Sequence, residues 1–560
     1  MADTTSTKKP APESSYKETV ESVLVAFILA FIFRAFVVEA FVIPTGSMAP
    51  TLYGAHLRFQ CPDCGYRFDV GYRGTDSANG DDVDIPSAAE RLQDVVCPNC
   101  AYVFPGGKNV IERVRFGDRI LVLKYLYLFK GPLRWDVVVF KSPSESSRHV
   151  PEDPEYGQNY IKRLVGKPNE SVVILDGKIY VGDFKAGGPN DKWEIQRKPR
   201  YVQDALWRNI YDNDFIPQNP QNSSIRNNGW TQPWQVAEGT GWTLSRGPQP
   251  SAAPSRLFEF AGGPGTLFFN STANPSLNYL TDWLAYDQIE SPGRSFKWVS
   301  DLKLTCFYQR SKGSGPLRLQ LTKSEHCFTA ELTPGKVRLI GSTVTQASDP
   351  ATGKGLATKD EKEIDSKSIP ELAEGGEPAR VDFINDDYRI SIRINDREVI
   401  GYAYPPNVPE LWARAIAPPG EHRHEDPFPR PEVRIAAAEQ TCTIEHLSLS
   451  RDIYYGNEGD YRDYRERLMG PFWGSPGNPV HLKSDEYFVL GDNSLISGDA
   501  RYWGDPVNLP REGLTGVLPG RVPERFMLGK AFFVYWPAGY PLLRTPVNAV
   551  PDFGEMRFIH

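Results

Sequence analysis

Histidine is scarce in this sequence, and positive charge is not in excess. Only 8 of the 560 residues are histidine, so chemistry that needs several imidazole groups has little material. The formal net charge is -7 and 24% of the residues are charged, whereas a nucleic-acid-binding protein usually contains a basic domain. We therefore expect no nucleic-acid partner.

Long hydrophobic runs are equally rare. Only Val23–Ile43 is long enough to cross a bilayer, because 21 residues in a helix extend about 31 Å, close to the hydrocarbon thickness. Arg34 and Glu39 interrupt its second half, where they are tolerated near the membrane interface. The alternative is a cleaved signal peptide, but no A-x-A cleavage pattern follows and the polar prefix is long. We predict an uncleaved anchor at residues 19–43 after a disordered cytoplasmic tail at residues 1–18.

Helix signals are otherwise few. The 48 prolines and 48 glycines favour a protein rich in loops and strands, and 560 residues are too many for one core. Alternating apolar and polar residues predict strands, and Asp176-Gly177 between two such runs predicts a hairpin. We predict a mostly β protein in which one β domain is split by an inserted β-sandwich. The predicted boundaries are 44–183 for the first part of the split domain, 184–256 for an irregular linker, 257–455 for the sandwich and 456–560 for the completion of the split domain.

A short motif after the apolar run indicates chemistry. Phe41–Leu52 reads F-V-I-P-T-G-S-M-A-P-T-L and contains Ser47, and Tyr160–Arg163 reads Y-I-K-R. Strand alternation would place Lys162 on one face with Leu164, which is an apolar setting. A lysine has an ordinary pKa of about 10.4, and burial favours the neutral amine that can activate a serine. The alternative for Lys162 is a surface lysine between core residues.

Four segments resemble the signature boxes of type I signal peptidases, the bacterial leader peptidases. They follow the apolar run in the order of that family, and the resemblance covers about residues 23–181 and 487–537. The segments are F-V-I-P-T-G-S-M-A-P-T-L at 41–52, G-D-R-I-L-V-L-K at 117–124, W-D-V-V-V-F-K-S-P with N-Y-I-K-R-L-V-G-K-P at 135–143 and 159–168, and G-D-N-S-L-I-S-G-D-A-R-Y-W-G at 491–504.

The resemblance implies roles for the residues around the serine. Ser47 is the nucleophile, and Lys162 is the general base that takes its proton and returns it to the leaving amine. The backbone N–H of Ser47 and the hydroxyl of Thr45 form the oxyanion hole, which stabilises the charge that develops on the substrate carbonyl. Without the resemblance, Thr45 would be interpreted as the cap of a turn.

The resemblance also implies supporting residues in the fourth segment. Ser497 orients the lysine amine, and Asp499 pairs with Arg501 beside the site. The alternative for this pair is a solvated salt bridge in a turn, which contributes less than about 1 kcal/mol. Ser494 and Ala500 depart from the usual wording of the segment, and both lie off the proposed catalytic positions.

The same resemblance implies a membrane-bound serine endopeptidase that removes signal peptides from exported preproteins after small residues, without a cofactor for catalysis. Its partners are preproteins and the lipid bilayer, which raises their effective concentration. Cleavage must occur outside the cytoplasm, so we expect a single-pass protein of the bacterial cytoplasmic membrane with its catalytic domain on the periplasmic side. Two alternatives stay open: a relative of the self-cleaving repressor peptidases, and a catalytically inactive membrane-anchored protein whose sandwich binds a glycan or a protein.

Cysteine is sparse, with seven residues, but four of them form two C-P-x-C pairs. Cys61, Cys64, Cys97 and Cys100 resemble the knuckles of a zinc ribbon within an insert at residues 57–106. Four thiolates would hold a structural Zn²⁺ in a tetrahedron that leaves no position for water. Two disulfides in an oxidising compartment are the competing interpretation. The remaining residues, expected to be buried free thiols, are Cys306, Cys327 and Cys442.

The predicted sandwich resembles a laminin-G or concanavalin-like jelly roll. The resemblance depends on Tyr388–Val399, which reads Y-R-I-S-I-R-I-N-D-R-E-V, and on H-L-S-L-S-R-D-I-Y-Y at 446–455. Such folds often bind glycans or protein surfaces, although a fold alone does not define a ligand. A glycan or a protein is therefore a candidate ligand of the sandwich, and the sequence alone does not identify its ligand.

Overall fold

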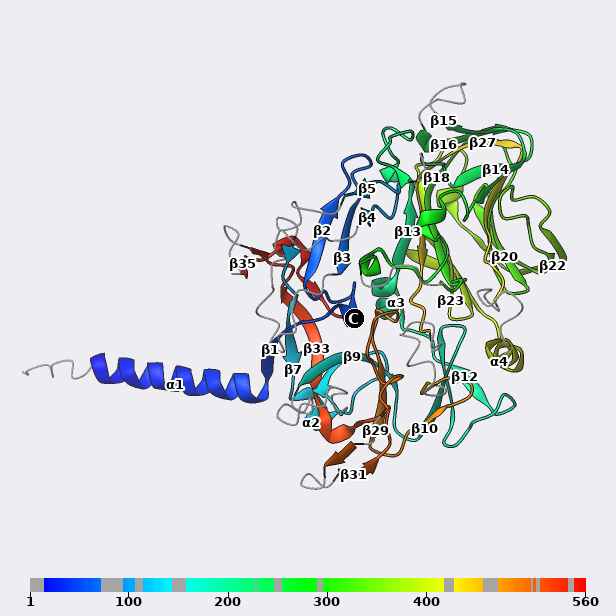
Figure 1. Ribbon diagram of the computed structural model, residues 1–560. Helices are drawn as coiled ribbons and strands as arrows, with labels where there is room; N and C mark the ends of the chain where they lie inside the picture. The colour runs from blue at the N-terminus through cyan, green and yellow to red at the C-terminus, as the bar shows by residue number, and fades with distance from the viewer. Residues whose placement is uncertain are drawn as a thin grey trace, which may run out of the picture.

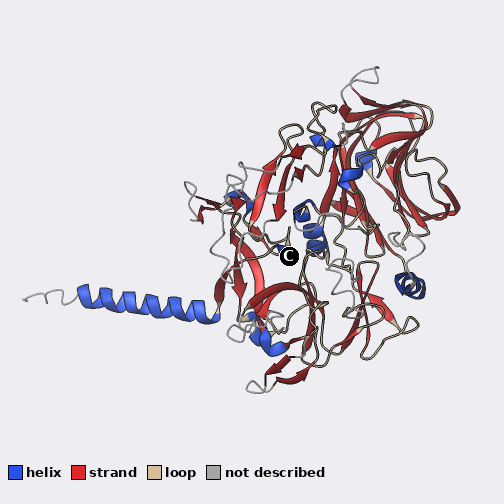
Figure 2. Cartoon of the chain, in the orientation of Figure 1, coloured by secondary structure: helices blue, strands red, loops and turns tan. Residues whose placement is uncertain are grey.

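A computed structural model of the protein consists mainly of β-strands and begins with the long helix α1 (Figures 1 and 2). The helices in the described part of the chain are α1 (Ser15–Phe36), α2 (Leu126–Phe129), α3 (Arg200–Leu206) and α4 (Val408–Ile416). The described residues are 15–71, 94–105, 114–143, 158–226, 229–245, 254–289, 296–416, 428–456, 472–504, 507–509, 514–541 and 548–560. Most of the predicted cytoplasmic tail, residues 1–14, lies outside them.

The predicted membrane helix is shorter than expected. Helix α1 ends at Phe36, and Val38–Val42 forms strand β1 instead of continuing the helix to residue 43. Strand β1 pairs antiparallel with β7 (Arg119–Leu123), with Phe41 opposite Ile120. Its β-branched and aromatic residues suit a sheet, and the partner strand lies far away in the sequence, so periodicity could not reveal this pairing.

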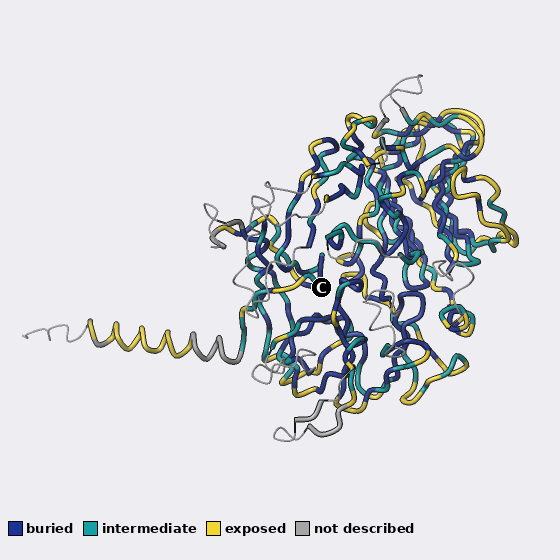
Figure 3. Tube along the Cα trace, viewed as in Figure 1, coloured by how far each residue is buried: buried dark blue, intermediate teal, exposed yellow. Residues whose placement is uncertain are grey.

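Helix α1 extends away from the rest of the molecule (Figure 1). The large apolar side chains between residues 20 and 29 are accordingly exposed, including Phe27 at 59% and Leu29 at 60%. In Figure 3 the coloured part of the helix is exposed, whereas much of the interior of the body is buried. Among the described residues, we find no helix with the combined length and hydropathy that a membrane crossing requires.

The split β domain is built around one sheet whose strands come from both ends of the chain. The strand order is β1-β7-β33-β8-β9-β29-β32, with β36 paired to β33. Distant segments therefore complete one sheet, and both of its faces are covered by buried apolar side chains. The bounds not yet given are β8 (Val137–Lys141), β9 (Asn159–Gly166), β29 (Glu486–Leu490), β32 (Val522–Pro523), β33 (Met527–Trp536) and β36 (Arg557–Phe558).

A smaller sheet joins this domain to the rest of the chain. Its order is β12-β11-β10-β28, and β10 turns into β11 through Asp176 and Gly177, both with positive φ, at 48° and 68°. The predicted hairpin is therefore confirmed, because this dipeptide tolerates the left-handed backbone that a two-residue turn requires. The bounds are β10 (Glu170–Leu175), β11 (Lys178–Asp183), β12 (Trp193–Ile195) and β28 (Val480–His481).

The insertion is a large β-sandwich of two antiparallel sheets. The first sheet has the order β15-β16-β27-β18-β23-β24-β25, with β13 paired to β27, and the second has the order β14-β17-β26-β19-β20-β21-β22. The strands of the first sheet are β13 (Arg208–Asp212), β15 (Trp242–Ser245), β16 (Pro254–Gly262), β18 (Leu302–Lys312), β23 (Ala379–Asp386), β24 (Arg389–Ile394), β25 (Arg397–Ala403) and β27 (Gln440–Arg451). Those of the second are β14 (Trp234–Gly239), β17 (Gly265–Phe269), β19 (Leu317–Lys323), β20 (His326–Thr333), β21 (Lys336–Gln346), β22 (Ala357–Ser368) and β26 (Val433–Ala437).

The expected irregular linker, residues 184–256, contributes to this sandwich. Strands β13, β14 and β15 arise within it and pair with sandwich strands. Trp234 on β14 is completely buried. These strands are short and lack a clear alternation, so only their tertiary pairing marks them as part of the sandwich.

Buried ion pairs fix the sandwich against the smaller sheet. The Lys178 amine lies 2.7 Å from carboxylate oxygens of both Asp301 and Asp452. The Lys198 amine lies 2.7 Å from Asp387 and 2.8 Å from Asp452. All five side chains are buried, and removing one partner of such a group leaves an uncompensated charge in the interior. The two bodies therefore have a defined relative position.

The described part of the cysteine-bearing insert contains two small hairpins beside the sandwich. One sheet has the order β3-β2-β6, and the strands β4 and β5 form the other hairpin. Each C-P-x-C segment forms the turn between paired strands, between β2 and β3 and between β4 and β5. The bounds are β2 (His56–Gln60), β3 (Arg67–Gly71), β4 (Val95–Val96), β5 (Val103–Phe104) and β6 (Val114–Arg115).

Two further pairs of short strands lie near the C-terminus of the chain. They are β30 (Val507–Leu509) with β31 (Leu514–Val517), and β34 (Tyr540–Pro541) with β35 (Asn548–Val550).

Candidate active site

Ser47 lies in a single tight turn that follows β1. The turn is the 3₁₀ segment η1 (Gly46–Met48), closed by a hydrogen bond from the Ala49 N–H to the Gly46 carbonyl at 2.9 Å. The Ser47 side chain is buried, with 8% of the residue exposed. Strand β1 therefore delivers this hydroxyl to the interior of the split domain, where it is held away from bulk water.

Lys162 on β9 meets Ser47 directly. Its Nζ donates a hydrogen bond to the Ser47 Oγ at 2.7 Å, across 115 residues of sequence. The amine also lies 5.7 Å from the centroid of the Tyr160 ring, two residues away on the same strand. Burial lowers the pKa of Lys162 from 10.5 to about 8, even though two nearby carboxylates favour its charged form. About one tenth of the amine is thus neutral at pH 7, and this form can act as a general base.

Thr45 also contacts the serine. Its Oγ1 lies 3.3 Å from the Ser47 Oγ, and its side chain makes no capping hydrogen bond to the turn. The contact places a second hydroxyl beside the nucleophile, where it can donate to a developing oxyanion. The geometry therefore differs from that of a simple turn cap.

Ser497 lies beside Ser47, but its hydroxyl makes no hydrogen bond to the lysine. Its N–H donates to the Asn493 carbonyl at 3.0 Å, and the Asn493 N–H donates to the Ser47 carbonyl at 3.1 Å. The Ser497 hydroxyl is buried and has no hydrogen-bond partner among the described residues. The expected hydrogen bond from this hydroxyl to the Lys162 amine is thus not formed in this conformation.

Asp499 and Arg501 form a completely buried ion pair. The Arg501 Nε and Nη2 each donate to one Asp499 oxygen at 2.8 Å, and the Gly491 N–H donates to Oδ2 at 2.9 Å. Both side chains have no exposed surface, so the alternative of a solvated turn salt bridge is wrong. Burial alone would raise the pKa of Asp499, but Arg501 keeps this pKa below its ordinary value. Asp499 in turn raises the pKa of Lys162, and Arg501 lowers it.

Sequence reasoning missed a second buried ion pair. The Arg163 Nε and Nη2 each donate to one oxygen of Asp492 at 2.7 Å, and Nη1 donates to the Trp135 carbonyl at 2.8 Å. This pair connects strand β9 to the segment that contains Ser497, so it fixes the lysine strand against the rest of the site. Its only sequence signals were an arginine next to Lys162 and an aspartate in a segment typical of turns.

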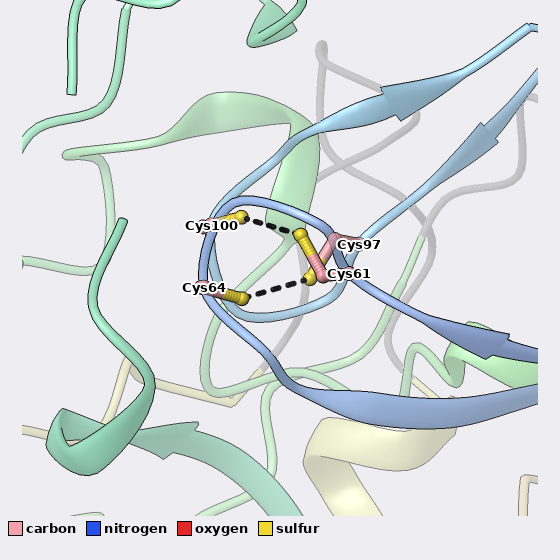
Figure 4. A group of neighbouring side chains, drawn as sticks. All are labelled: Cys61, Cys64, Cys97 and Cys100. Carbon is pink, nitrogen blue, oxygen red and sulfur yellow. Dashed lines mark hydrogen bonds between the residues drawn. The ribbon is translucent and has the colours of Figure 1, made fainter. Parts of the chain in front are cut away.

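The four cysteines of the insert converge at one point (Figure 4). The Sγ atoms of Cys61 and Cys100 are 3.5 Å apart, and those of Cys64 and Cys97 are 3.7 Å apart. All four residues are buried free thiols whose Sγ atoms lie within 4.8 Å of one another. A tetrahedral Zn²⁺ with Zn–S bonds of about 2.3 Å separates its sulfurs by about 3.8 Å. These residues therefore fit a four-thiolate metal centre, whereas a disulfide requires about 2.05 Å.

The profile of a family described as signal peptidase, peptidase S26, matches residues 102–261 and 434–536. The matched residues include Lys162 and the segment 491–504, whereas Ser47 precedes them. Most strands of the sandwich lie between the matched ranges, but β13, β14, β15 and β27 lie within them.

Similar curated proteins have related names. The chain is 36% identical over 117 residues to signal peptidase I of Pseudomonas aeruginosa, covering 19% of this chain and 37% of that protein. It is 30% identical over 127 residues to signal peptidase I of Pseudomonas fluorescens, covering 22% and 40%. It is 23% identical over 197 residues to the probable signal peptidase I-1 of Synechocystis, covering 35% and 65%. The chain thus spans about two fifths of the length of the two Pseudomonas relatives.

Solved structures that cover part of the chain are also similar to it. The carbohydrate binding module CBM66 from Bacillus subtilis matches at 10% identity with a TM-score of 0.21, covering 39% of this chain and 94% of that one. The Bacillus licheniformis β-glucanase matches at 8% identity with a TM-score of 0.22, covering 42% and 96%. Similarity at this level supports no inference about the ligand of the sandwich.

Proposed function

We propose that this protein is a serine endopeptidase that removes signal peptides from exported preproteins by cleavage after small residues. The observation that carries the proposal is the buried hydrogen bond of 2.7 Å between the Lys162 amine and the Ser47 hydroxyl. The family match and the names of the similar proteins support a signal peptidase I hydrolase. No group besides these side chains is needed for the proton transfers, so the proposed reaction uses no cofactor.

The reaction proceeds through an acyl-enzyme. Neutral Lys162 takes the hydroxyl proton of Ser47 while the oxygen attacks the scissile carbonyl carbon and forms a C–O bond. The Ser47 N–H and the Thr45 hydroxyl donate to the resulting oxyanion. When the C–N bond breaks, Lys162 returns the proton to the leaving amine. A water molecule then attacks the ester, Lys162 takes a proton from it, and the new C-terminus leaves as Ser47 regains its proton.

The two buried ion pairs serve this chemistry by holding the base. Asp492 and Asp499 favour protonated Lys162, whereas burial and Arg501 favour the neutral amine. The balance keeps the pKa near the working pH, where a base is both sufficiently deprotonated and able to accept a proton. Arg163 keeps its own strand in place through Asp492, so Lys162 approaches Ser47 without a freely moving backbone.

The experiment that tests this function is cleavage of a preprotein by the purified chain and its variants. Ser47→Ala and Lys162→Ala should each reduce the single-turnover rate by at least about 10³-fold, because both residues act on the same proton. The matched controls, Ser368→Ala and Lys483→Ala, alter exposed residues and should retain the wild-type rate. Wild-type activity in either dyad variant would overturn the mechanism. Failure of the unmodified chain to cleave any preprotein would instead favour the catalytically inactive binding protein, with a glycan or protein ligand on the sandwich.

Helix α1 attaches this enzyme to a bilayer, with the catalytic domain on the extracytoplasmic side of the bacterial inner membrane. The support is its exposed apolar side chains, including Leu24, Phe27 and Leu29. Attachment to the surface that holds the preprotein raises the effective substrate concentration. Replacing these three residues by serine should abolish flotation with phospholipid vesicles, whereas Phe553→Ser, which alters another exposed aromatic residue, should not. Retained flotation of the triple variant would contradict this attachment.

The cysteine cluster holds a structural Zn²⁺. The support is the separation of the thiols, which suits a tetrahedron of four sulfurs. The complete set of four thiolates leaves no position for a reacting water, so the ion stabilises the insert and takes no part in peptide cleavage. Two oxidised pairs are the alternative, and free-thiol counting on the metal-stripped, denatured protein distinguishes them.

A further inference from the structure

The sandwich reaches the serine through one short segment, residues 285–288, which comprises the 3₁₀ turn η7 (Ala285–Asp287) and Gln288. This segment lies outside the ranges 102–261 and 434–536 that match the peptidase family. We infer that it is a positioning element of the peptidase site: Asp287 and Tyr286 hold the serine turn in place, and Gln288 connects them to the cysteine cluster. The inference rests on the proposed function.

Asp287 acts on Ser47 through Asn493. The Asp287 Oδ1 accepts a hydrogen bond of 2.7 Å from the Asn493 side-chain amide, although 206 residues separate the two. The Asn493 N–H donates to the Ser47 carbonyl at 3.1 Å, and its carbonyl accepts from the Ser497 N–H. Both Asp287 and Asn493 are buried, with 3% and 0% exposed. The carboxylate of the sandwich therefore orients the amide that holds the backbone of the nucleophile.

Tyr286 packs on the glycine before the nucleophile. A Cβ atom added to Gly46 would overlap its ring, and one added to Gly71 on β3 would lie 2.6 Å from the ring. The ring also lies 5.9 Å from that of Tyr53, measured between centroids. Gly46 is thus required at this position because an aromatic ring from the sandwich occupies the space that any side chain would need. The ring limits movement of the turn toward the sandwich.

Gln288 connects this segment to the insert. Its Oε1 accepts from the Val96 N–H at 2.8 Å, and its Nε2 donates to the Val96 carbonyl at 2.9 Å. Val96 directly precedes Cys97, one of the four clustered cysteines. These two hydrogen bonds from the Gln288 side chain resemble those that a neighbouring strand would make to Val96. They therefore fix the position of Gln288 relative to Val96. The serine turn and the metal-binding hairpin are therefore connected through four consecutive residues of the sandwich.

The first test measures kcat and KM for Asp287→Ala, with the rate expressed per active site titrated by a serine-directed covalent reagent. We expect kcat to fall about 10- to 100-fold with KM changed less than about twofold, because small misplacement of a nucleophile is costly. Asp287→Asn keeps an acceptor oxygen for Asn493 and should restore most of the rate. The pH at which activity begins should stay unchanged, since the pKa of Lys162 is set by burial, Asp499, Asp492 and Arg501.

The control for general destabilisation is Glu432→Ala. Glu432 is a buried carboxylate whose partners, Ser348 and Arg434, also belong to the sandwich. This variant should lower the melting temperature but keep the wild-type kcat per titrated site. Wild-type kcat in Asp287→Ala, or an equal loss in Asp287→Asn, would overturn the positioning role. If Ser47→Ala and Lys162→Ala stay active in the same assay, the proposed function fails instead.

A second test adds a methyl group at Gly46 and then removes the ring of Tyr286. Gly46→Ala should abolish activity, because the new methyl group must displace Tyr286 or the serine turn. Adding Tyr286→Ala removes the obstacle, so the double variant should regain at least about tenfold over Gly46→Ala, which corresponds to about 1.4 kcal/mol. A double variant as inactive as Gly46→Ala would show that the ring does not constrain the turn and would overturn this part of the inference.

Discussion

Changing the pH should titrate Lys162 directly, because its neutral amine is the base in the proposed mechanism. Burial is the largest influence on this lysine and lowers its pKa from 10.5 to about 8. A pKa of about 8 leaves about one tenth of the amine neutral at pH 7 and about nine tenths at pH 9. The acylation rate should therefore rise about tenfold over this interval and then reach a plateau.

The assay is single-turnover cleavage of a preprotein with enzyme in excess, followed from about pH 6 to about pH 10.5, so that product release does not mask the chemical step. A lysine with its ordinary pKa would produce an increase of about 100-fold between pH 7 and pH 9, without a plateau. That result would refute the reasoning, because it would mean that burial does not favour the neutral amine of Lys162 in the working enzyme.

Asp499→Asn tests the electrostatic part of the same argument. The carboxylate of Asp499 raises the pKa of Lys162, and its partner Arg501 lowers it. Removing the negative charge leaves Arg501 uncompensated, so the plateau should begin at lower pH than in the wild type. Asp214→Asn is the control, because Asp214 pairs with the exposed side chain of His446. A shift of the plateau to higher pH would contradict the assigned charges.

Three further predictions concern stability and metal content. Lys162→Met should stabilise the fold at pH 7 by up to about 3 kcal/mol. The pKa of Lys162 is depressed in the folded state, so the unfolded state binds a proton at this amine more tightly than the folded state does. The gain should disappear above about pH 10.5, and denaturant unfolding measured at pH 7 and above pH 10.5 checks it. Asp492→Ala should cost about 3 to 5 kcal/mol in the same measurement, because it leaves Arg163 buried without its partner. Cys97→Ser should reduce the zinc measured by mass spectrometry from about one ion per chain to a small fraction and lower the melting temperature, whereas Cys442→Ser should leave the zinc content unchanged.

Local patterns were sufficient where neighbouring residues determine the structure. The Asp176-Gly177 turn follows from the backbone preferences of two residues, and the alternating patterns of the sandwich follow from one buried face. The four segments that resemble those of type I signal peptidases likewise identify Ser47 and Lys162 as candidates. The structure brings Ser47 and Lys162 to 2.7 Å, which no local pattern specifies.

Contacts between distant segments explain what the sequence did not reveal. The apolar run was expected to stay helical to residue 43, but Val38–Val42 pairs with β7 and becomes a strand. Parts of residues 184–256 become strands of the sandwich for the same reason, because a partner strand satisfies their backbone groups. Hydropathy describes how apolar a segment is and does not identify its partner.

The sequence by itself therefore determined the β-rich class, the candidate nucleophile and base, and the four cysteines that can bind a metal. The candidate nucleophile and base follow from the resemblance of four segments to a known family, and the other features depend on residue type and short spacing, which are visible without a fold. Only the tertiary structure decided where Arg163 finds its partner and that the pair of Asp499 and Arg501 is buried. It also decided how far the N-terminal helix extends and that Asp287 reaches the serine turn through Asn493. The physical reason is that hydrogen bonds and ion pairs depend on distance in space, and the chain brings these residues together only when both of its β bodies have formed.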